Sequence, residues 1–137
     1  MQPADVEPFL ASLKRCLARP DFLARFYEQF IASSEEVREK FRNTDMKRQV
    51  RMLEDSLFVV AVAVQGEEGS LARADLPRIA ARHGRQQLDI PPGLYDLWTD
   101  CLIASARQHD PAFSDDLERA WREVLAFGVR YMRDHAD

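Results

Sequence analysis

Among the three histidines of this 137-residue chain, His83 is the one in a segment whose apolar residues have helical spacing. Leu76, Ile79 and Ala80 share its face of the expected helix, so its imidazole lies on the inward side. A buried imidazole must be hydrogen-bonded, paired with a charge or bound to a metal, because an unsatisfied buried polar group costs about 1–3 kcal/mol. Taken with its neighbours alone, His83 is better explained as a hydrogen-bonded core residue than as a metal ligand.

The rest of the chain shows the helical period in every long segment. The expected helices run from Asp5 to before Pro20, from Asp21 through Ile31, from Ser34 to Phe41, from Thr44 or Asp45 through Val64, from about Ser70 to Gly84, from about Gly93 to Gln108 and from Ser114 to about Asp134. The alternation of a strand occurs nowhere at useful length. The sequence therefore predicts a single all-α domain, residues 1–137, with roughly seven or eight helices.

Composition and charge narrow the class of protein. Hydrophobic residues make up 46% and charged residues 31% of the chain, as in an ordinary globular domain. A net charge of -4 argues against a nucleic-acid partner. The longest apolar run, residues 57–64, is far too short to span a membrane. Without an export signal we expect a cytoplasmic protein in which Cys16 and Cys101 are reduced core residues and do not bind zinc.

Residues on other helices change the interpretation of His83. Tyr27 precedes Phe41 by fourteen residues, Gln49 and Leu53 are four apart, and His83 follows Leu53 by thirty. The pattern continues with Tyr95, the Leu97-Trp98 pair, Leu102 and the Ala120-Trp121 pair. In this order and spacing the chain resembles the globin family, specifically the single-domain bacterial globins similar to the haemoglobin domain of flavohaemoglobins. The resemblance extends over about residues 21–132.

The resemblance implies a globin-like fold around a pocket for haem b, iron protoporphyrin IX. It makes His83 the axial iron ligand, opposite an open coordination site. Tyr27 and Gln49 become the distal donors toward a bound diatomic gas. The residues expected to contact the haem are Phe41, Leu53, Arg82, Leu88, Ile90 and Tyr95. The function implied is reversible binding of O₂, and also of NO or CO, by a monomer or homodimer without a membrane partner.

Several alternatives stay open at this point. Tyr27 can instead be a packing aromatic with its hydroxyl at the surface, and a register shift of one residue would turn Arg48 inward in place of Gln49. A nitric-oxide dioxygenase would use the same residues with a separate reductase. That alternative is weakened because Arg133 stands where flavohaemoglobins carry a glutamate, and no flavin module follows. The third alternative is a haem-free globin-like sensor or interaction module with His83 in its core.

Overall fold

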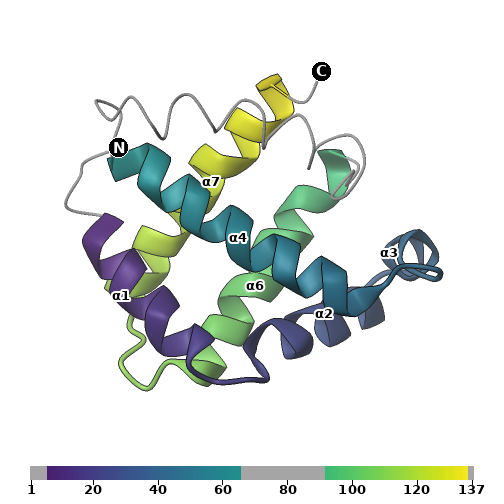
Figure 1. Ribbon diagram of the computed structural model, residues 1–137, viewed down its shortest axis with the longest axis horizontal. Coiled ribbons are helices and arrows are strands. Elements are labelled where there is room, and N and C mark those ends of the chain that lie inside the picture. Colours follow the sequence, from purple (N-terminus) through teal and green to yellow (C-terminus); the bar gives the residue numbers. More distant parts are fainter. Residues whose placement is uncertain (1–5, 66–91, 136–137) are drawn as a thin grey trace.

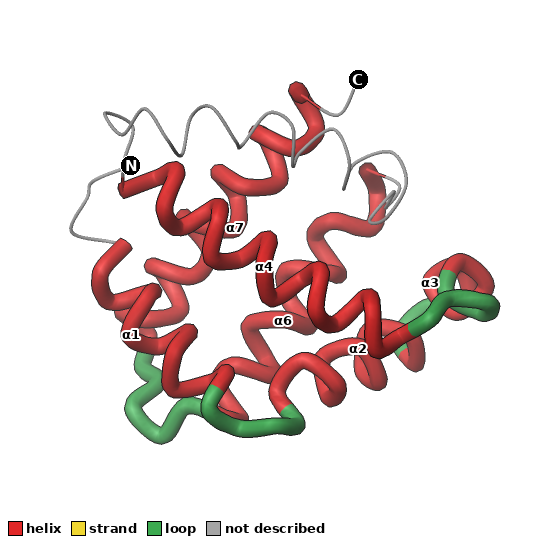
Figure 2. The backbone as a smooth tube through the Cα atoms, viewed as in Figure 1, coloured by secondary structure: helices red, strands yellow, loops and turns green. Residues whose placement is uncertain are grey.

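The computed structural model describes residues 6–65 and 92–135, and all regular structure within these ranges is helical (Figures 1 and 2). The elements are α1 (Val6–Leu17), α2 (Phe22–Ala32), α3 (Glu35–Lys40), α4 (Met46–Gln65), the 3-10 turn η3 (Pro92–Leu94), α6 (Tyr95–His109) and α7 (Asp115–His135). The all-α prediction is confirmed. The expected helix that contains His83 lies outside the described residues. Among the described helices, none is both long and apolar enough to cross a membrane.

Side-chain caps explain where three of the helices begin. The Ser34 hydroxyl accepts a hydrogen bond from the Val37 amide at 3.4 Å, and Ser114 accepts one from the Leu117 amide at 3.2 Å. At the start of α4 the carboxylate of Asp45 accepts from the Arg48 amide at 3.4 Å. Each cap satisfies one of the amides that the first helical turn leaves without a partner. The structure therefore selects Asp45, and not Thr44, as the cap of α4.

Aromatic side chains on α1, α2 and α7 form a cluster within the core. Phe9 packs edge-on against Trp121 with ring centroids 4.8 Å apart, and Phe22 contacts the same indole at 6.1 Å. Both phenylalanines and the tryptophan are at most 1% exposed. Phe26 and Phe30 extend this cluster along α2, which packs on α6. Burying a large side chain contributes about 1.5–3 kcal/mol, so these aromatics account for much of the association of the helices.

A glycine allows α4 and α7 to come close together. An ideal Cβ on Gly128 would lie only 2.9 Å from Cγ1 of Val60. Real Cβ atoms essentially never come this close to another side-chain atom. Valine is stiff about its first side-chain torsion and cannot easily turn away. The approach of α7 to α4 therefore depends on the missing side chain at position 128.

A buried polar network joins α1 to the segment between α6 and α7. Asp110, which is 2% exposed, accepts a bidentate pair of hydrogen bonds from the Arg15 guanidinium at 2.6 and 3.0 Å. The Ser12 hydroxyl donates to the same carboxylate at 2.6 Å, and the Ala112 amide donates at 2.9 Å. Trp121 Nε1 in turn donates to the Ser12 oxygen at 3.0 Å. The buried side-chain polar atoms of this network, on Ser12, Asp110 and Trp121, all have partners, as burial requires.

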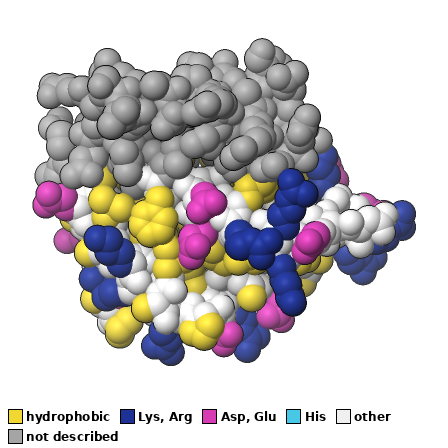
Figure 3. Space-filling view, viewed as in Figure 1, with side chains coloured by type: hydrophobic (Ala, Val, Ile, Leu, Met, Phe, Trp, Pro, Cys, Tyr) yellow, Lys and Arg dark blue, Asp and Glu magenta, His cyan; other side chains and the backbone are white. Residues whose placement is uncertain are grey.

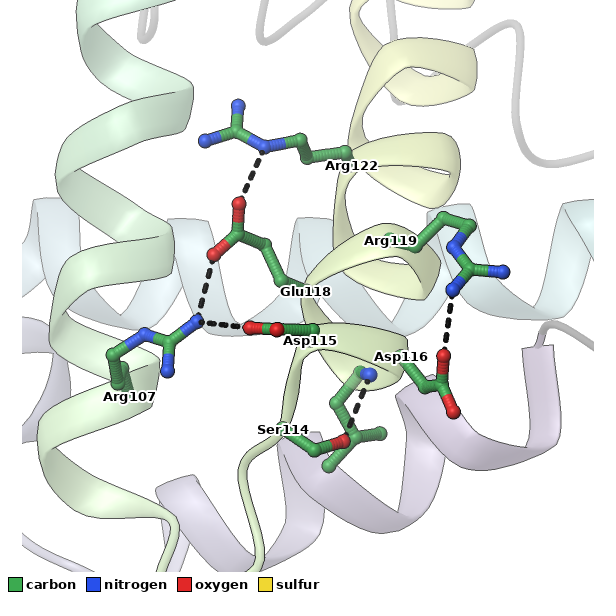
Figure 4. Close-up of polar contacts among 8 residues, drawn as sticks. Arg107, Ser114, Asp115, Asp116, Glu118, Arg119 and Arg122 are labelled. Atoms are coloured by element: carbon green, nitrogen blue, oxygen red, sulfur yellow. Dashed lines mark hydrogen bonds and ion pairs between the residues drawn. The ribbon is translucent and has the colours of Figure 1, made fainter.

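Exposed ion pairs add a second link between α6 and α7 (Figure 4). Arg107 on α6 reaches Glu118 at 2.8 Å and Asp115 at 3.6 Å on α7, and Glu118 also accepts from Arg122 at 3.2 Å. Pairs of this kind each contribute about 0.2–1 kcal/mol, because water screens them and the side chains lose entropy. They support the packing of the two helices without determining it.

The two cysteines differ in burial. Cys16 is fully buried, and burial is the main reason why the pKa of its thiol is raised to about 12. It is a protonated packing residue, as predicted. Cys101 lies half-buried at the edge of the core, 4.0 Å from the Ser33 hydroxyl. Both are free thiols.

We expect Asp110→Ala to lower the free energy of unfolding by about 2–4 kcal/mol, because Ser12 and the Ala112 amide lose a buried acceptor. Burial alone would raise the pKa of Asp110, but the hydrogen bonds from Arg15, Ser12 and Ala112 outweigh it and leave the pKa below its usual value. The stabilisation is therefore present above the unfolded-state pKa of about 3.9 and is lost as the pH falls through the lower folded-state pKa. Urea denaturation from pH 7 down to pH 3 measures both effects.

The matched control is Asp116→Ala, which removes an exposed ion pair with Arg119 at 2.6 Å. That change should cost less than about 0.5 kcal/mol. An equal loss in both variants would contradict a special role for the buried network.

Candidate functional site

Four of the residues singled out from the sequence gather where α2, α3 and α4 meet. Tyr27 lies on α2, Phe41 forms the C-terminal cap of α3, and Gln49 and Leu53 lie one turn apart on α4. All four are buried, with exposures between 1% and 7%. We call these four residues the α2–α4 cluster. The structure thus brings together side chains that are up to 26 positions apart in the chain.

The register of α4 determines which polar side chain faces the interior. Gln49 is 5% exposed, whereas its neighbour Arg48 is exposed to solvent. The alternative register that would turn Arg48 inward is therefore wrong. An uncharged amide, not a guanidinium, is the polar group that α4 contributes to the α2–α4 cluster.

The hydroxyl of Tyr27 is buried and lacks a hydrogen-bond partner among the described residues. The Gln49 side chain is close enough to the phenol to lower its pKa. Leaving such a group unpaired costs about 1–3 kcal/mol, and most buried polar atoms in folded proteins do have partners. The alternative in which this hydroxyl lies at the surface is therefore wrong. An unpaired buried donor suggests a place for a ligand.

Burial also fixes the protonation state of this donor. It raises the pKa of the Tyr27 hydroxyl well above its ordinary value, and the Gln49 side chain opposes the shift only in part. Burial has this effect because the phenolate loses its hydration. Tyr27 is therefore a neutral phenol over the physiological pH range, able to donate a hydrogen bond.

Phe41 closes one side of the cluster. Its ring meets the Tyr27 ring edge-on with centroids 5.8 Å apart and packs at a tilt on Phe30 at 6.2 Å. Such aromatic pairs add about 0.5–1.5 kcal/mol beyond the area they bury. The position of Tyr27 is therefore held from two directions, by α3 and by its own helix.

Leu53 of the cluster also lines a small apolar cavity of about 10 Å³. The cavity is lined by Leu53, Ser56, Leu57, Val60, Trp98, Leu125, Gly128 and Val129. Trp98 is 3% exposed and its Nε1 also lacks a partner among the described residues. The sequence analysis did not single out the Trp98 N–H as a donor, because an indole in an apolar stripe is usually a packing residue.

Tyr95 is half-buried at the start of α6 and meets Trp98 edge-on at 6.5 Å. It therefore stands beside the cavity wall and outside the α2–α4 cluster. His83, Arg82, Leu88 and Ile90 lie outside the described residues, so their roles stay predictions. His109, which the sequence did not suggest as a ligand, bonds through Nδ1 to the Ser105 carbonyl at 2.8 Å.

The fold and the placement of this cluster define a protein with the globin fold. A crystal structure of a protein from Pseudomonas aeruginosa PAO1, described as structurally highly homologous to a human hemoglobin, is similar to this chain. The two share 32% sequence identity over 96% of this chain and 98% of the other, with a TM-score of 0.82. The chain belongs to the family of that bacterial protein. No family model and no curated protein matches it.

We expect Tyr27→Phe to leave the free energy of unfolding of the ligand-free protein unchanged, or to raise it by up to about 1 kcal/mol. The reason is that the variant removes a buried hydroxyl that has no partner. Ser105→Ala is the contrasting control, because the Ser105 hydroxyl donates to the Phe22 carbonyl at 2.8 Å. That variant should lose about 1 kcal/mol in the same urea titration. A comparable loss in Tyr27→Phe would mean that its hydroxyl is already paired.

Proposed function

We propose that this chain binds haem b and that the pocket reversibly binds O₂ and related diatomic gases. The supporting observation is the unpaired, buried hydroxyl of Tyr27 beside Gln49 and Phe41 in a protein of globin fold. A functional site is where a protein tolerates an unsatisfied donor, since the ligand supplies the missing acceptor. When bound, haem would supply an iron atom that coordinates the gas.

The residues of the α2–α4 cluster fit the distal side of such a pocket. Tyr27 would donate a hydrogen bond to a bound ligand that carries partial negative charge, and its raised pKa keeps the proton on the phenol. Gln49 would hold the phenol in place through its amide or donate to the ligand directly. Phe41 and Leu53 would exclude water from the site because both are almost fully buried and apolar.

The remaining contacts in this proposal come from the sequence resemblance. His83 would hold the iron, since a neutral imidazole binds iron through a ring nitrogen. Arg82 would pair with a propionate group, to which a guanidinium can donate two parallel hydrogen bonds. Leu88, Ile90 and Tyr95 would add contacts to the edge and face of the ring. The half-buried position of Tyr95 beside Trp98 is compatible with this role.

Haem titration tests the cofactor and the axial ligand. We expect the purified chain to take up one equivalent of haem with a strong Soret band. His83→Ala should lose most of its haem to an apomyoglobin acceptor, because the iron loses its protein ligand. His109→Gln is the control and should retain haem, since that ring is bonded to the backbone of its own helix. A wild-type chain with no Soret band after haem addition would refute the proposal in favour of a haem-free module.

Gas release tests the distal donor. A hydrogen bond to a charged acceptor is worth about 1.5–3 kcal/mol, so Tyr27→Phe should raise the O₂ dissociation rate by about 10- to 100-fold. CO release should change little, because bound CO carries less negative charge. Arg48→Ala, next to Gln49 but exposed, should alter neither rate. Stopped-flow ligand replacement measures both gases, and equal acceleration of both would argue against a hydrogen bond from Tyr27.

A further inference from the structure

A second feature of the molecule lies beside the α2–α4 cluster. A groove of about 850 Å³ runs between α2, α3 and α4, and we call it the α2–α4 groove. Its walls are mainly apolar, and it is lined by Ala24, Tyr27, Glu28, Ile31, Ala32, Arg38, Met46, Lys47, Val50 and Arg51. This volume lies in the range of about 300–1,000 Å³ that is typical of small-molecule sites.

The groove uses a different face of α4 from the proposed gas site. Met46 and Val50 are one turn apart and form its floor, whereas Gln49 and Leu53 are not among its lining residues. Residues 49 and 50 differ by about 100° around a helix, so they point to neighbouring faces. Tyr27 is the one member of the α2–α4 cluster that also lines the groove.

The rim of the groove carries an excess of positive charge. Glu28 is already paired with Arg25 at 3.8 Å, and Arg38 is paired with Glu35. Lys47 and Arg51, by contrast, have no ion-pair partner among the described residues. Lys47 and Arg51 therefore stand one turn apart at the edge of an apolar groove that is also lined by Glu28.

One of the two cations, Lys47, occupies an electrostatically unfavourable position on α4. Lys47 lies in the first turn of the helix, which contains no acidic residue. A cation near a helix N-terminus opposes the helix dipole by about 0.3–1 kcal/mol. The cap carboxylate of Asp45 already offsets part of this cost. The space-filling view shows Lys and Arg side chains beside hydrophobic ones on the face where α4 begins, with Asp and Glu side chains among them (Figure 3). The combination of apolar walls and a cationic rim matches an amphipathic anion.

The size of the groove favours a small molecule over a protein. Ten residues from three helices line it, whereas a stable protein interface engages about 20–30 residues on each side. We propose that the α2–α4 groove binds a free long-chain carboxylate. Its alkyl chain lies on Ala24, Ile31 and Val50, and its carboxylate is held by Lys47 and Arg51. This site would work whether or not the protein carries haem.

Binding of dodecanoate, kept below its micelle concentration, tests this proposal by isothermal titration calorimetry on the full chain. Arg51→Glu and Lys47→Glu should each weaken binding by about ten-fold, whereas Arg48→Glu, exposed on the same helix and outside the groove, should change it less than about two-fold. Ala24→Trp should fill the groove and weaken binding at least ten-fold. Ala11→Trp, exposed on α1, is its control. Circular dichroism confirms that each variant is folded.

Three results would overturn the proposal. Equal binding of dodecylamine and dodecanoate would show that the cations do not select the headgroup. Loss of dodecanoate binding in Gln49→Ala, with Arg51→Glu unaffected, would place the ligand in the α2–α4 cluster. Sedimentation with vesicles of anionic phospholipid, without any binding of free dodecanoate, would make the groove part of a membrane-docking surface.

Discussion

The bidentate pair between Arg15 and Asp110 holds together the elements on which the rest of the structure depends. Asp110 ends α6, and its carboxylate is bonded to α1 through Arg15 and Ser12 and to the next segment through the Ala112 amide. Ser12 extends the contact to Trp121 on α7. One carboxylate thus links α1 to the end of α6 and, through Ser12, to Trp121 on α7. Because a charge without partners is costly to bury, few other arrangements of these helices would be stable.

The buried polar groups around Asp110 and those around Tyr27 differ in how many of them have hydrogen-bond partners. Around Asp110 every donor has an acceptor, which is the usual condition of a structural core. At Tyr27 and Trp98 two donors face the interior without partners among the described residues. The cost of about 1–3 kcal/mol for each such group has to be offset by packing elsewhere. Aromatic contacts around Tyr27, from Phe26 and Phe41, supply part of that offset and keep the hydroxyl in a fixed position.

Much of the fold follows from local pattern, because apolar spacing, caps and prolines act within one or two turns. The starts of α3 and α7 at Ser34 and Ser114 are of this kind. Local pattern could not decide whether Gln49 or its neighbour Arg48 faces the interior. Only the packing of α4 against other helices determines which of the two is buried. For Asp110 the local sequence predicts the helix end correctly but not the buried network. Followed by Pro111 it indicates a helix end, and nothing local reveals that its partners are 95 and 98 positions earlier.

The close approach of α7 to α4 has a consequence for how this chain can vary. Positions 60 and 128 share one volume, because a Cβ at 128 would meet the methyl groups of Val60. Among related chains, a larger residue at 128 should accompany alanine or glycine at 60, so that the pair covaries although 68 positions separate its members. The same shared volume borders the cavity next to Leu53. A larger residue at 128 paired with a smaller one at 60 would therefore reshape the interior beside the α2–α4 cluster. No residue of that cluster would need to change.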